Sequence, residues 1–235
     1  MIRIQNLHKR FHKNYVLKGI DLSIDCGGVF AILGPNSSGK TTLIKSILGM
    51  VIPNKGSIEV FGNKIKWGAN YRKKIDYLPQ IANFPNNLKF IELLKMIKDL
   101  RGGYSDDKSL IKRFQLQPFL DKKLGNLSGG TKQKINIVLT FMFDSPILIL
   151  DEPTSGLDPI ALIHLKKLIQ KEKKKGKTIL ITSHIMSFVE EVSDEIVFLL
   201  EGKIYFKGTI NNLKAHSKQA TFESAIASLL THKHV

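Results

Sequence analysis

Residues 28–42 read GVFAILGPNSSGKTT, an apolar run at 28–33 followed by a loop that contains two glycines and ends in Lys40-Thr41-Thr42. An uninterrupted apolar run of this kind is expected of a central strand that is covered on both faces. The loop from Gly34 to Thr42 fits the pattern G-x-x-x-x-G-K-[ST], which binds phosphate when it joins a strand to a helix. The sequence therefore predicts a strand, a phosphate-binding loop and a helix that begins near Lys40.

Each part of this loop has a chemical role toward a phosphate. Glycine lets backbone N–H groups turn inward as a nest of donors, and the start of the helix adds unpaired donors and a positive dipole end. Lys40 is expected to reach the β- and γ-phosphates, and the Thr41 hydroxyl is expected to bind Mg²⁺. The predicted nucleotide-binding residues of the loop are Gly34, Pro35, Asn36, Ser37, Ser38, Gly39, Lys40, Thr41 and Thr42.

A second strand-like run, Ile147–Leu150, ends in the two acidic residues Asp151 and Glu152. Ligands of open α/β sheets bind at the carboxyl ends of the strands, so Asp151 is expected to hold the Mg²⁺ directly or through water. Successive strand residues point to opposite faces, and Glu152 is therefore expected to orient and polarise the attacking water. Paired acids beside so apolar a strand are costly without a cation, which favours this interpretation over two solvated strand-end acids.

A second glycine-rich helix start lies at Ser128-Gly129-Gly130. Ser128 is a suitable N-cap, and the two glycines let an anion approach the backbone. This segment has neither the lysine nor the carboxylates of a complete phosphate site. We interpret it as a half-site that another subunit completes, although Ser-Gly-Gly alone is more commonly an ordinary helix cap.

The order of these motifs resembles that of the nucleotide-binding subunit of an ABC transporter. The resemblance includes residues 34–42, Ser128-Gly129-Gly130, Ile149–Pro153 and Ser155–Asp158, and it covers essentially the whole chain. It implies an α/β fold, the P-loop NTPase fold of ABC type, with a RecA-like core sheet, an antiparallel β sub-domain and an inserted α-helical sub-domain. It also implies ATP hydrolysis, with ATP and Mg²⁺ as the bound groups.

The same resemblance implies roles for single residues elsewhere in the chain. Gln80 matches the glutamine that joins the core to the helical insertion and senses Mg²⁺ and water. His184 matches the switch histidine that contacts the γ-phosphate, and Asp158 matches the acid that acts across the dimer. Phe11 matches the aromatic residue that stacks on adenine, with Tyr15 as the second candidate. The implied catalytic residues are Lys40, Gln80, Glu152 and His184, and the implied metal ligands are Thr41, Gln80 and Asp151.

Two positions depart from the family's pattern. Ser37 stands where the family usually has glycine, so a side chain must be tolerated close to the phosphate. Thr131 stands where the family often has glutamine. Neither position supplies a charge that hydrolysis needs, and both changes are therefore expected to adjust the activity rather than abolish it.

The pattern of strand and helix signals predicts how the chain is organised. Strand signals fade after about residue 82 and return at residue 147, with helix-period segments between them. The strand runs Ile147–Leu150, Thr178–Ile181 and Ile196–Leu200 then alternate with helix patterns, which predicts a parallel sheet with crossover helices. The last segment is expected to be a polar and peripheral helical tail. The predicted divisions are 1–82 for the β sub-domain and first part of the nucleotide-binding core, 83–143 for the helical insertion with the signature helix, 144–208 for the second part of the core, and 209–235 for the C-terminal helical tail.

The composition limits the class and the location of the protein. With 43% hydrophobic and 24% charged residues, the chain is neither disordered nor fibrous. The net charge of +16 fits a solvated basic surface, a nucleic-acid footprint, or attraction to an anionic membrane or an acidic partner. Cys26 is the only cysteine, so no intrachain disulfide can form, and a reducing compartment is indicated. No apolar run approaches the roughly 20 residues of a membrane helix, so the chain is expected to fold and work in the cytosol. The resemblance to a transporter subunit implies that it works there as a peripheral subunit at the cytoplasmic face of the inner membrane.

The resemblance also implies partners. Two copies of the chain would form a head-to-tail homodimer around two ATP molecules, one copy supplying Ser128 and Gly130 to the site of the other. Separate transmembrane permease subunits would dock in a groove of the helical insertion near Gln80. No nucleic acid is expected as a partner, because residues 80–128 are too short for a long coiled coil and the chain has one cassette.

Within the family, several segments are similar to the ATPase subunit of the Nos transporter, which serves assembly of the copper–sulfur centre of nitrous-oxide reductase and implies a periplasmic partner. The segments are Tyr71–Ile75, Leu78–Gln80, Asn83–Leu88, Phe119–Lys122, Thr131–Lys134 and Phe198–Lys203. The alternatives are the ATPase of another ABC exporter, a nucleic-acid-associated ABC-type ATPase, and an ATP-binding module without catalysis. Intact Glu152 and His184 speak against the last of these.

Overall fold

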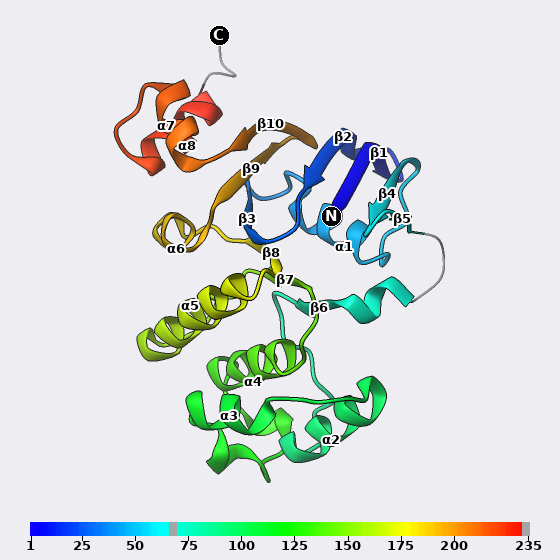
Figure 1. The fold of residues 1–235 in the computed structure, drawn as a ribbon, viewed down its shortest axis with the longest axis vertical. Helices are drawn as coiled ribbons and strands as arrows, with labels where there is room; N and C mark the ends of the chain where they lie inside the picture. The colour runs from blue at the N-terminus through cyan, green and yellow to red at the C-terminus, as the bar shows by residue number, and fades with distance from the viewer. Residues whose placement is uncertain (66–69, 232–235) are drawn as a thin grey trace.

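The computed structural model describes residues 1–65 and 70–231, which form two β-sheets with helices packed around them (Figure 1). The larger sheet passes through the middle of the molecule. Its strands, in spatial order, are β10 (Lys203–Gly208), β9 (Glu195–Leu200), β3 (Gly28–Leu33), β8 (Thr178–Thr182), β7 (Ile147–Asp151) and β6 (Ile75–Leu78).

The pairing within the larger sheet confirms the expected parallel core. The pairs β9–β3, β3–β8, β8–β7 and β7–β6 are all parallel, as the alternation of strand and helix patterns predicts. Only the edge strand β10 is antiparallel, since Glu201-Gly202 turns it back against β9. Parallel pairing brings the carboxyl ends of β3, β8 and β7 to the same edge, where the predicted site residues follow them.

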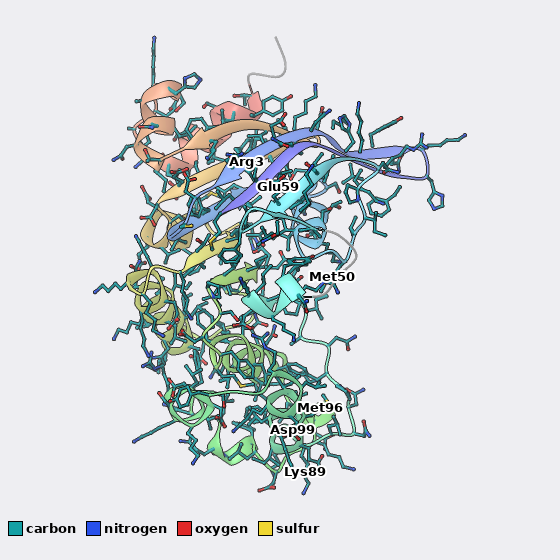
Figure 2. The ribbon with its side chains drawn as sticks, turned by 45° about the vertical axis from the view of Figure 1, so that its right-hand side comes forward. Arg3, Met50, Glu59, Lys89, Met96 and Asp99 are labelled. Carbon is teal, nitrogen blue, oxygen red and sulfur yellow. The ribbon has the colours of Figure 1, made fainter. Side chains whose placement is uncertain are left out.

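The smaller sheet is antiparallel, as the resemblance implies. It consists of β2 (Asn14–Ile24), β1 (Ile2–Phe11), β4 (Lys55–Val60) and β5 (Asn63–Lys64), in that order. Ile20, Leu22 and Ile24 alternate with exposed residues and are buried. Arg3 and Glu59 are cross-strand partners on β1 and β4, and Figure 2 shows their side chains next to each other on the outside of the sheet.

Both faces of the larger sheet are covered, which explains why its strands are continuous apolar runs. Ile147 and Ile149 pack on one face with α1 (Lys40–Ile47) and the smaller sheet. Leu148 and Leu150 point to the opposite face and pack with α5 (Pro159–Lys174) and the helical insertion. The side chains of this one strand, all buried and pointing alternately to the two faces, therefore connect the two halves of the core.

The segment between β6 and β7 is helical, as its 3.6-residue periodicity predicts. Figure 1 shows this insertion below the sheet, with α4 nearest to it. A further helix, α6 (Met186–Val192), follows His184, with Ile185 as its N-cap. The elements around and within the insertion are η1 (Asn70–Lys74), α2 (Phe90–Arg101), α3 (Asp107–Arg113), η2 (Gln117–Phe119), η3 (Leu124–Asn126) and α4 (Gly129–Phe141).

The C-terminal helices correct the prediction of a polar, peripheral tail. α7 (Ile210–Ser217) and α8 (Phe222–Thr231) contribute Leu213 and Phe222, both fully buried, to an apolar cluster with Phe198 of the core sheet. The apolar residues of α8 recur at helical spacing, so they form one apolar stripe along the helix. The overall polarity of the C-terminal segment conceals this stripe in the sequence. The tail is therefore part of the packed core.

The predicted divisions at residues 82, 143 and 208 coincide with loops or strand ends, but they stay a prediction, because no independent domain boundary tests them. Residues 66–69 and 232–235 of these divisions lie outside the described residues. In the part of the chain that the structure describes, no helix has both the length and the apolar character to span a membrane.

A buried ion pair joins the helical insertion to the core. Asp76 on β6 is 3% exposed, and Arg101, the last residue of α2, places Nη2 at 2.8 Å from its Oδ1. Arg101 also donates to the Ser145 hydroxyl and lies over the Phe143 ring. Burial raises the pKa of Asp76, and the positive charge of Arg101 partly offsets that rise. The pair therefore compensates a charge that would otherwise be costly at this interface.

We expect Arg101→Met to lower the free energy of unfolding by about 3 kcal/mol, the low end for breaking a buried ion pair, because the Arg101 side chain is 30% exposed. Burial raises the pKa of Asp76, so the folded variant keeps a proton at pH values where the unfolded chain has lost it. The difference in unfolding free energy between wild type and Arg101→Met, measured by urea unfolding, should therefore be smaller at about pH 5 than at about pH 8.

Arg3→Met is the matched control, because Arg3 is an exposed arginine on the smaller sheet. Its change in unfolding free energy should stay within about 0.5 kcal/mol at both pH values. An equal loss of stability for Arg101→Met at the two pH values would show that Asp76 is not the group left uncompensated.

Candidate functional site

A cavity of about 330 Å³ lies at the carboxyl ends of β3 and β7, the edge at which open α/β sheets bind ligands. Residues 36–42 of the phosphate loop form one part of its wall, and Asp151 and Glu152 form another. Phe11, Val16 and Gln80 complete the lining. The structure thus brings most of the predicted site residues to one place, although Gly34 and Pro35 of the loop are not part of the lining.

The backbone conformation explains the residue types of the loop. A Cβ on Gly34, at φ +145°, would lie 2.0 Å from the carbonyl oxygen of Leu199, so no larger residue fits. Gly39, at φ +109°, caps α1 without a side-chain hydrogen bond and leaves the first N–H groups of the helix for a ligand. Ser37 has φ +65°, a left-handed conformation that glycine adopts more easily, which gives a physical reason for the family's usual residue.

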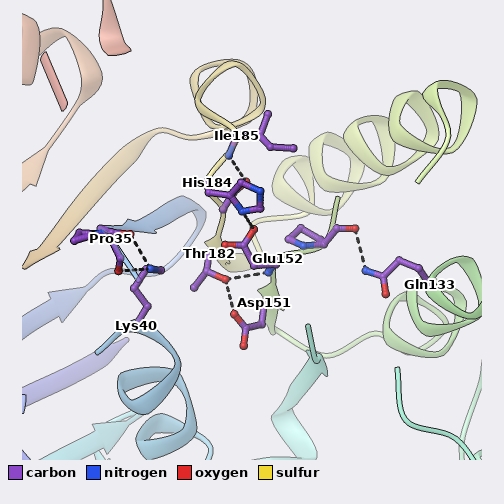
Figure 3. A network of polar contacts seen from close by, with 11 residues as sticks. Pro35, Lys40, Gln133, Asp151, Glu152, Thr182, His184 and Ile185 are labelled. Atoms are coloured by element: carbon purple, nitrogen blue, oxygen red, sulfur yellow. Dashed lines mark hydrogen bonds and ion pairs between the residues drawn. The ribbon is translucent and has the colours of Figure 1, made fainter. Parts of the chain in front are cut away.

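The side chains of the loop fit a triphosphate. The Ser38 hydroxyl is buried without a hydrogen-bond partner among the described residues, although it sits in the middle of the loop. Lys40 Nζ donates to the carbonyl oxygens of Gly34 and Pro35 at 2.7 and 2.9 Å (Figure 3). Burial lowers the pKa of Lys40, and the charges of Glu152 and Asp151 oppose that shift. Phosphate oxygens would supply an acceptor to Ser38 and a counter-charge to Lys40.

The neighbouring strand β8 holds the two acids at the end of β7. Thr182 Oγ1 donates to Asp151 Oδ1 at 2.5 Å, and the Glu152 N–H donates to Thr182 Oγ1 at 2.9 Å (Figure 3). On the other side of β7, burial and then the negative charge of Asp151 raise the pKa of Tyr77 on β6 to about 12. Asp151 is therefore held by hydrogen bonding from β8 and lies close to the phenol of Tyr77 on β6.

Glu152 leaves the strand in a left-handed conformation, with φ +48°. Its Oε2 lies 2.8 Å from Nδ1 of His184. A carboxylate accepts hydrogen bonds, so Nδ1 of the imidazole carries the proton in this contact. His184 does not line the cavity itself, and it reaches the site through Glu152. The two residues therefore form one unit beside the phosphate loop.

The donor set at the cavity fits Mg²⁺. The predicted ligands Thr41, Gln80 and Asp151 all line the cavity and offer hydroxyl, amide and carboxylate oxygens, the donors that this ion prefers. Within residues 1–65 and 70–231, no group of three or more His, Cys, Asp and Glu residues could hold a metal ion. The hydroxyl, amide and carboxylate donors that line the cavity therefore suit a hard cation.

The two aromatic candidates near the N-terminus differ in position. Phe11, at the end of β1, lines the cavity and keeps 44% of its surface exposed. Lys9 Nζ lies 4.8 Å from the centre of its ring. Tyr15 is exposed and is not part of the cavity wall. The geometry thus favours Phe11 over Tyr15 as a stacking surface for a base.

The segment Ser128-Gly129-Gly130 lies away from the cavity wall, at the start of α4. Ser128 caps this helix, as predicted, because its Oγ accepts a hydrogen bond from the Thr131 N–H at 3.2 Å. Ser128 and Gly129 are exposed, and a Cβ built on Gly129 would meet no atom within 4 Å. Gly130 is confined instead, since its Cβ would lie 2.7 Å from the carbonyl oxygen of Gly156.

Asp158 caps a helix in its own chain. Its carboxylate accepts a hydrogen bond from the Ala161 N–H at 2.8 Å and pairs with Lys134 Nζ at 2.5 Å. The hydrogen bond from Lys134 lowers the pKa of Asp158. Asp158 is thus tied to α4, the helix that begins with the exposed Ser128-Gly129 edge.

Sequence reasoning missed the polar residues that connect α4 to the site. Gln133 Nε2 donates to the Pro153 carbonyl at 3.2 Å, directly after Glu152. Asn136 Nδ2 donates to the Pro79 carbonyl at 3.0 Å, directly before Gln80. Gln133, Asn136 and Thr140 are spaced by three and four residues and are buried together with the apolar residues of α4, and this spacing is the signal that the sequence offers. Thr182 and Tyr77 carried no such signal, because each is one polar residue in a strand.

Comparison with known proteins agrees with this geometry. Residues 17–155 match the family described as ABC transporter. The lantibiotic transport ATP-binding protein SrtF of Streptococcus pyogenes is 34% identical over 228 residues, which is 95% of this chain and 99% of that protein. The Nod factor export ATP-binding protein I of Burkholderia lata is 32% identical over 213 residues, 88% of this chain and 70% of that protein.

A solved structure shows the same fold over its full length. It is the ATP-binding subunit of an ABC transporter, with 28% identity and a TM-score of 0.92, and the match covers 98% of this chain and 100% of that chain. With the phosphate loop, the paired acids and the capped glycine helix in place, the chain belongs to the ABC transporter family, as an ATP-binding subunit with ATPase activity.

Proposed function

We propose that this subunit binds Mg²⁺ and ATP in the cavity between the phosphate loop and the two acids, and that hydrolysis there drives separate membrane subunits. The observation that carries the proposal is the meeting of Lys40 with Asp151 and Glu152 at one cavity, with His184 hydrogen bonded to Glu152. Phosphoryl transfer needs little beyond positioning and charge neutralisation, and this arrangement supplies both.

Each residue has a distinct task in this proposal. Lys40 and the N–H groups at the start of α1 bind the phosphates, and Phe11 stacks on the adenine. Glu152 orients the attacking water and takes up its proton, while His184 holds that carboxylate through Nδ1. The γ-phosphate contact that the family resemblance implies for His184 would require the histidine to turn into the cavity, since it stands outside the cavity wall in this conformation. Thr41, Asp151 and Gln80 would hold Mg²⁺, which neutralises phosphate charge when bound.

The position of the Ser128-Gly129 edge supports a head-to-tail homodimer. This edge is exposed and stands outside the cavity wall, so it cannot complete the phosphate site of its own chain in this conformation. A second copy would place its Ser128, Gly129 and Gly130 against the triphosphate of the first, with Asp158 acting between the two. A symmetric pair closes both sites at once, as complementary edges require.

Exposed apolar residues support docking of a membrane subunit near Gln80. Met50 is 60% exposed, Ile81 is 76% exposed and Met96 is 40% exposed. Figure 2 shows Met50 and Met96 on the same side of the molecule. Exposed apolar side chains on this side of the molecule, together with Ile81 directly after Gln80, fit a permease segment, which would hold this chain peripherally at the cytoplasmic face of the membrane.

The cargo is the most specific part of the proposal. The Nos assignment rests on the similarity of the segments around Gln80 and α4, and the relatives reported above give it no support. Their names, lantibiotic transport and Nod factor export, favour the alternative of another ABC exporter. We therefore place the general exporter ahead of the Nos system. Co-purification of the membrane subunits, with or without a copper-handling periplasmic protein, separates the two.

The variant Glu152→Gln should keep ATP binding and lose about 10²- to 10⁴-fold in the rate of phosphate release, because it removes the base but not the phosphate ligands. ATP should also trap this variant as a dimer, measured by light scattering on a size-exclusion column. Glu223→Gln, an exposed acid on α8, is the matched control and should behave as wild type. Steady-state hydrolysis at the wild-type rate would remove Glu152 from its role.

A mixing experiment tests the composite site. Lys40→Ala should bind ATP poorly, and Gly129→Asp should bind ATP but repel the partner's triphosphate, so neither variant alone should hydrolyse it. An acid at the first turn of α4 is favourable for the monomer by about 0.3–1 kcal/mol, so Gly129→Asp should fold normally. A mixed dimer contains one intact site, made of the Gly129→Asp chain's loop and the Lys40→Ala chain's glycine edge.

Mixing the two inactive variants should therefore restore part of the wild-type phosphate release. The restored rate should rise with the fraction of mixed dimer, measured by differential tagging. Mixtures that contain mixed dimers but stay inactive would contradict the head-to-tail arrangement. Normal activity of Gly129→Asp alone would show that this edge never meets a triphosphate.

A further inference from the structure

Thr182 occupies a special place in the sheet. It is the last residue of β8, fully buried, and in the parallel register it is the Cα partner of Asp151, the last residue of β7. Neighbouring strands lie about 4.8 Å apart, so partner side chains on the same face are within reach of each other. The strand register alone therefore places the Thr182 hydroxyl beside Asp151, the first of the two acids.

The hydroxyl of Thr182 contacts both acids in a fixed direction. It accepts a hydrogen bond from the Glu152 N–H at 2.9 Å and has one proton to donate, which goes to Asp151 Oδ1 at 2.5 Å. The Thr182 carbonyl oxygen accepts from the same N–H at 3.2 Å. One threonine thus holds the carboxylate of Asp151 and the backbone of Glu152 together.

The backbone of Glu152 needs such support. A non-glycine residue at φ +48° is strained, and such a conformation persists only where the surroundings determine it. The contacts to its N–H come from Thr182, and the contact to its carboxylate comes from His184. Without the Thr182 hydroxyl, the N–H would keep only the longer bond to the carbonyl.

We infer that Thr182 is a positioning residue for hydrolysis, which sets the carboxylate of Asp151 for Mg²⁺ and the backbone of Glu152 for the attacking water through one hydroxyl. The inference rests on the proposed function, because it gives a further residue of the same site a task. Thr182 does not line the cavity and so touches neither nucleotide nor water. Its action goes entirely through the two acids.

The test is Thr182→Val, which keeps the shape of the side chain and removes the hydroxyl. Outer-shell partners of metal ligands typically contribute about 10- to 100-fold in metal affinity or activity, so kcat should fall by that order. In equilibrium binding of a fluorescent ATP analogue, affinity in EDTA should stay at the wild-type value. When Mg²⁺ is added stepwise, the Mg²⁺ concentration that gives half of its effect on binding of the analogue should rise about 10-fold or more.

Thr178→Val is the matched control on the same strand. Thr178 is also fully buried, and its hydroxyl also accepts a hydrogen bond from a backbone N–H, that of Gly27, and donates to the Asp25 carbonyl and to the Met1 sulfur. It lies at the opposite end of β8, far from the acids along the strand. Thr178→Val should lose stability in urea unfolding but keep the wild-type Mg²⁺ dependence. Thr182→Ser restores the hydroxyl and should recover most of the lost kcat.

The outcomes are distinct. The inference is overturned if Thr182→Val matches Thr178→Val in Mg²⁺ dependence and kcat, or if Thr182→Ser is as impaired as Thr182→Val. Should Thr182→Val fail to fold, Thr182→Ala, which cannot overfill the site, takes its place under the same criteria. Failure of the proposed function itself looks different, because the wild-type protein would then show no ATP hydrolysis and no Mg²⁺-dependent binding.

Discussion

Parallel hydrogen bonding between β7 and β8 is the constraint on which the site depends. The strands themselves are held by apolar residues that pack on both faces of the sheet, and their register sets Asp151 beside Thr182. A slip by one residue would turn every side chain of β7 to the other face. The chemistry at the strand ends is therefore determined by the packing of the strand interiors, since no polar contact there could correct a wrong register.

Much of this arrangement could be predicted from local sequence, for a physical reason. The phosphate loop and the glycine-rich start of α4 are short segments whose residue types are required by backbone conformation, as Gly34 beside the Leu199 carbonyl illustrates. Strand and helix periodicity likewise predicted the parallel core and the helical insertion. The role of Thr182 could not be predicted, because it arises from register between strands some thirty residues apart. The buried stripe of α8 was hidden for a different reason, the polar average of its segment.

Polar contacts also connect the helical insertion to the core on both sides of the cavity. Asn136 reaches the backbone before Gln80, and Gln133 reaches the backbone after Glu152. Arg101 adds the buried pair with Asp76, four residues before Gln80. A rotation of the insertion would therefore pull on the segments that carry Gln80 and Glu152. In the proposed function, these contacts would connect a membrane subunit docked on the insertion to the state of the nucleotide.

The packing of α8 has a practical meaning for how the protein can be handled. The recognisable motifs end with His184, and a truncation after β10 would seem harmless from the sequence. Removing α8 would uncover Phe198 and its apolar neighbours on the strand next to β3, which carries the phosphate loop. A shortened version would therefore be prone to aggregate. A fusion appended beyond Thr231 leaves α8 in place over these apolar residues.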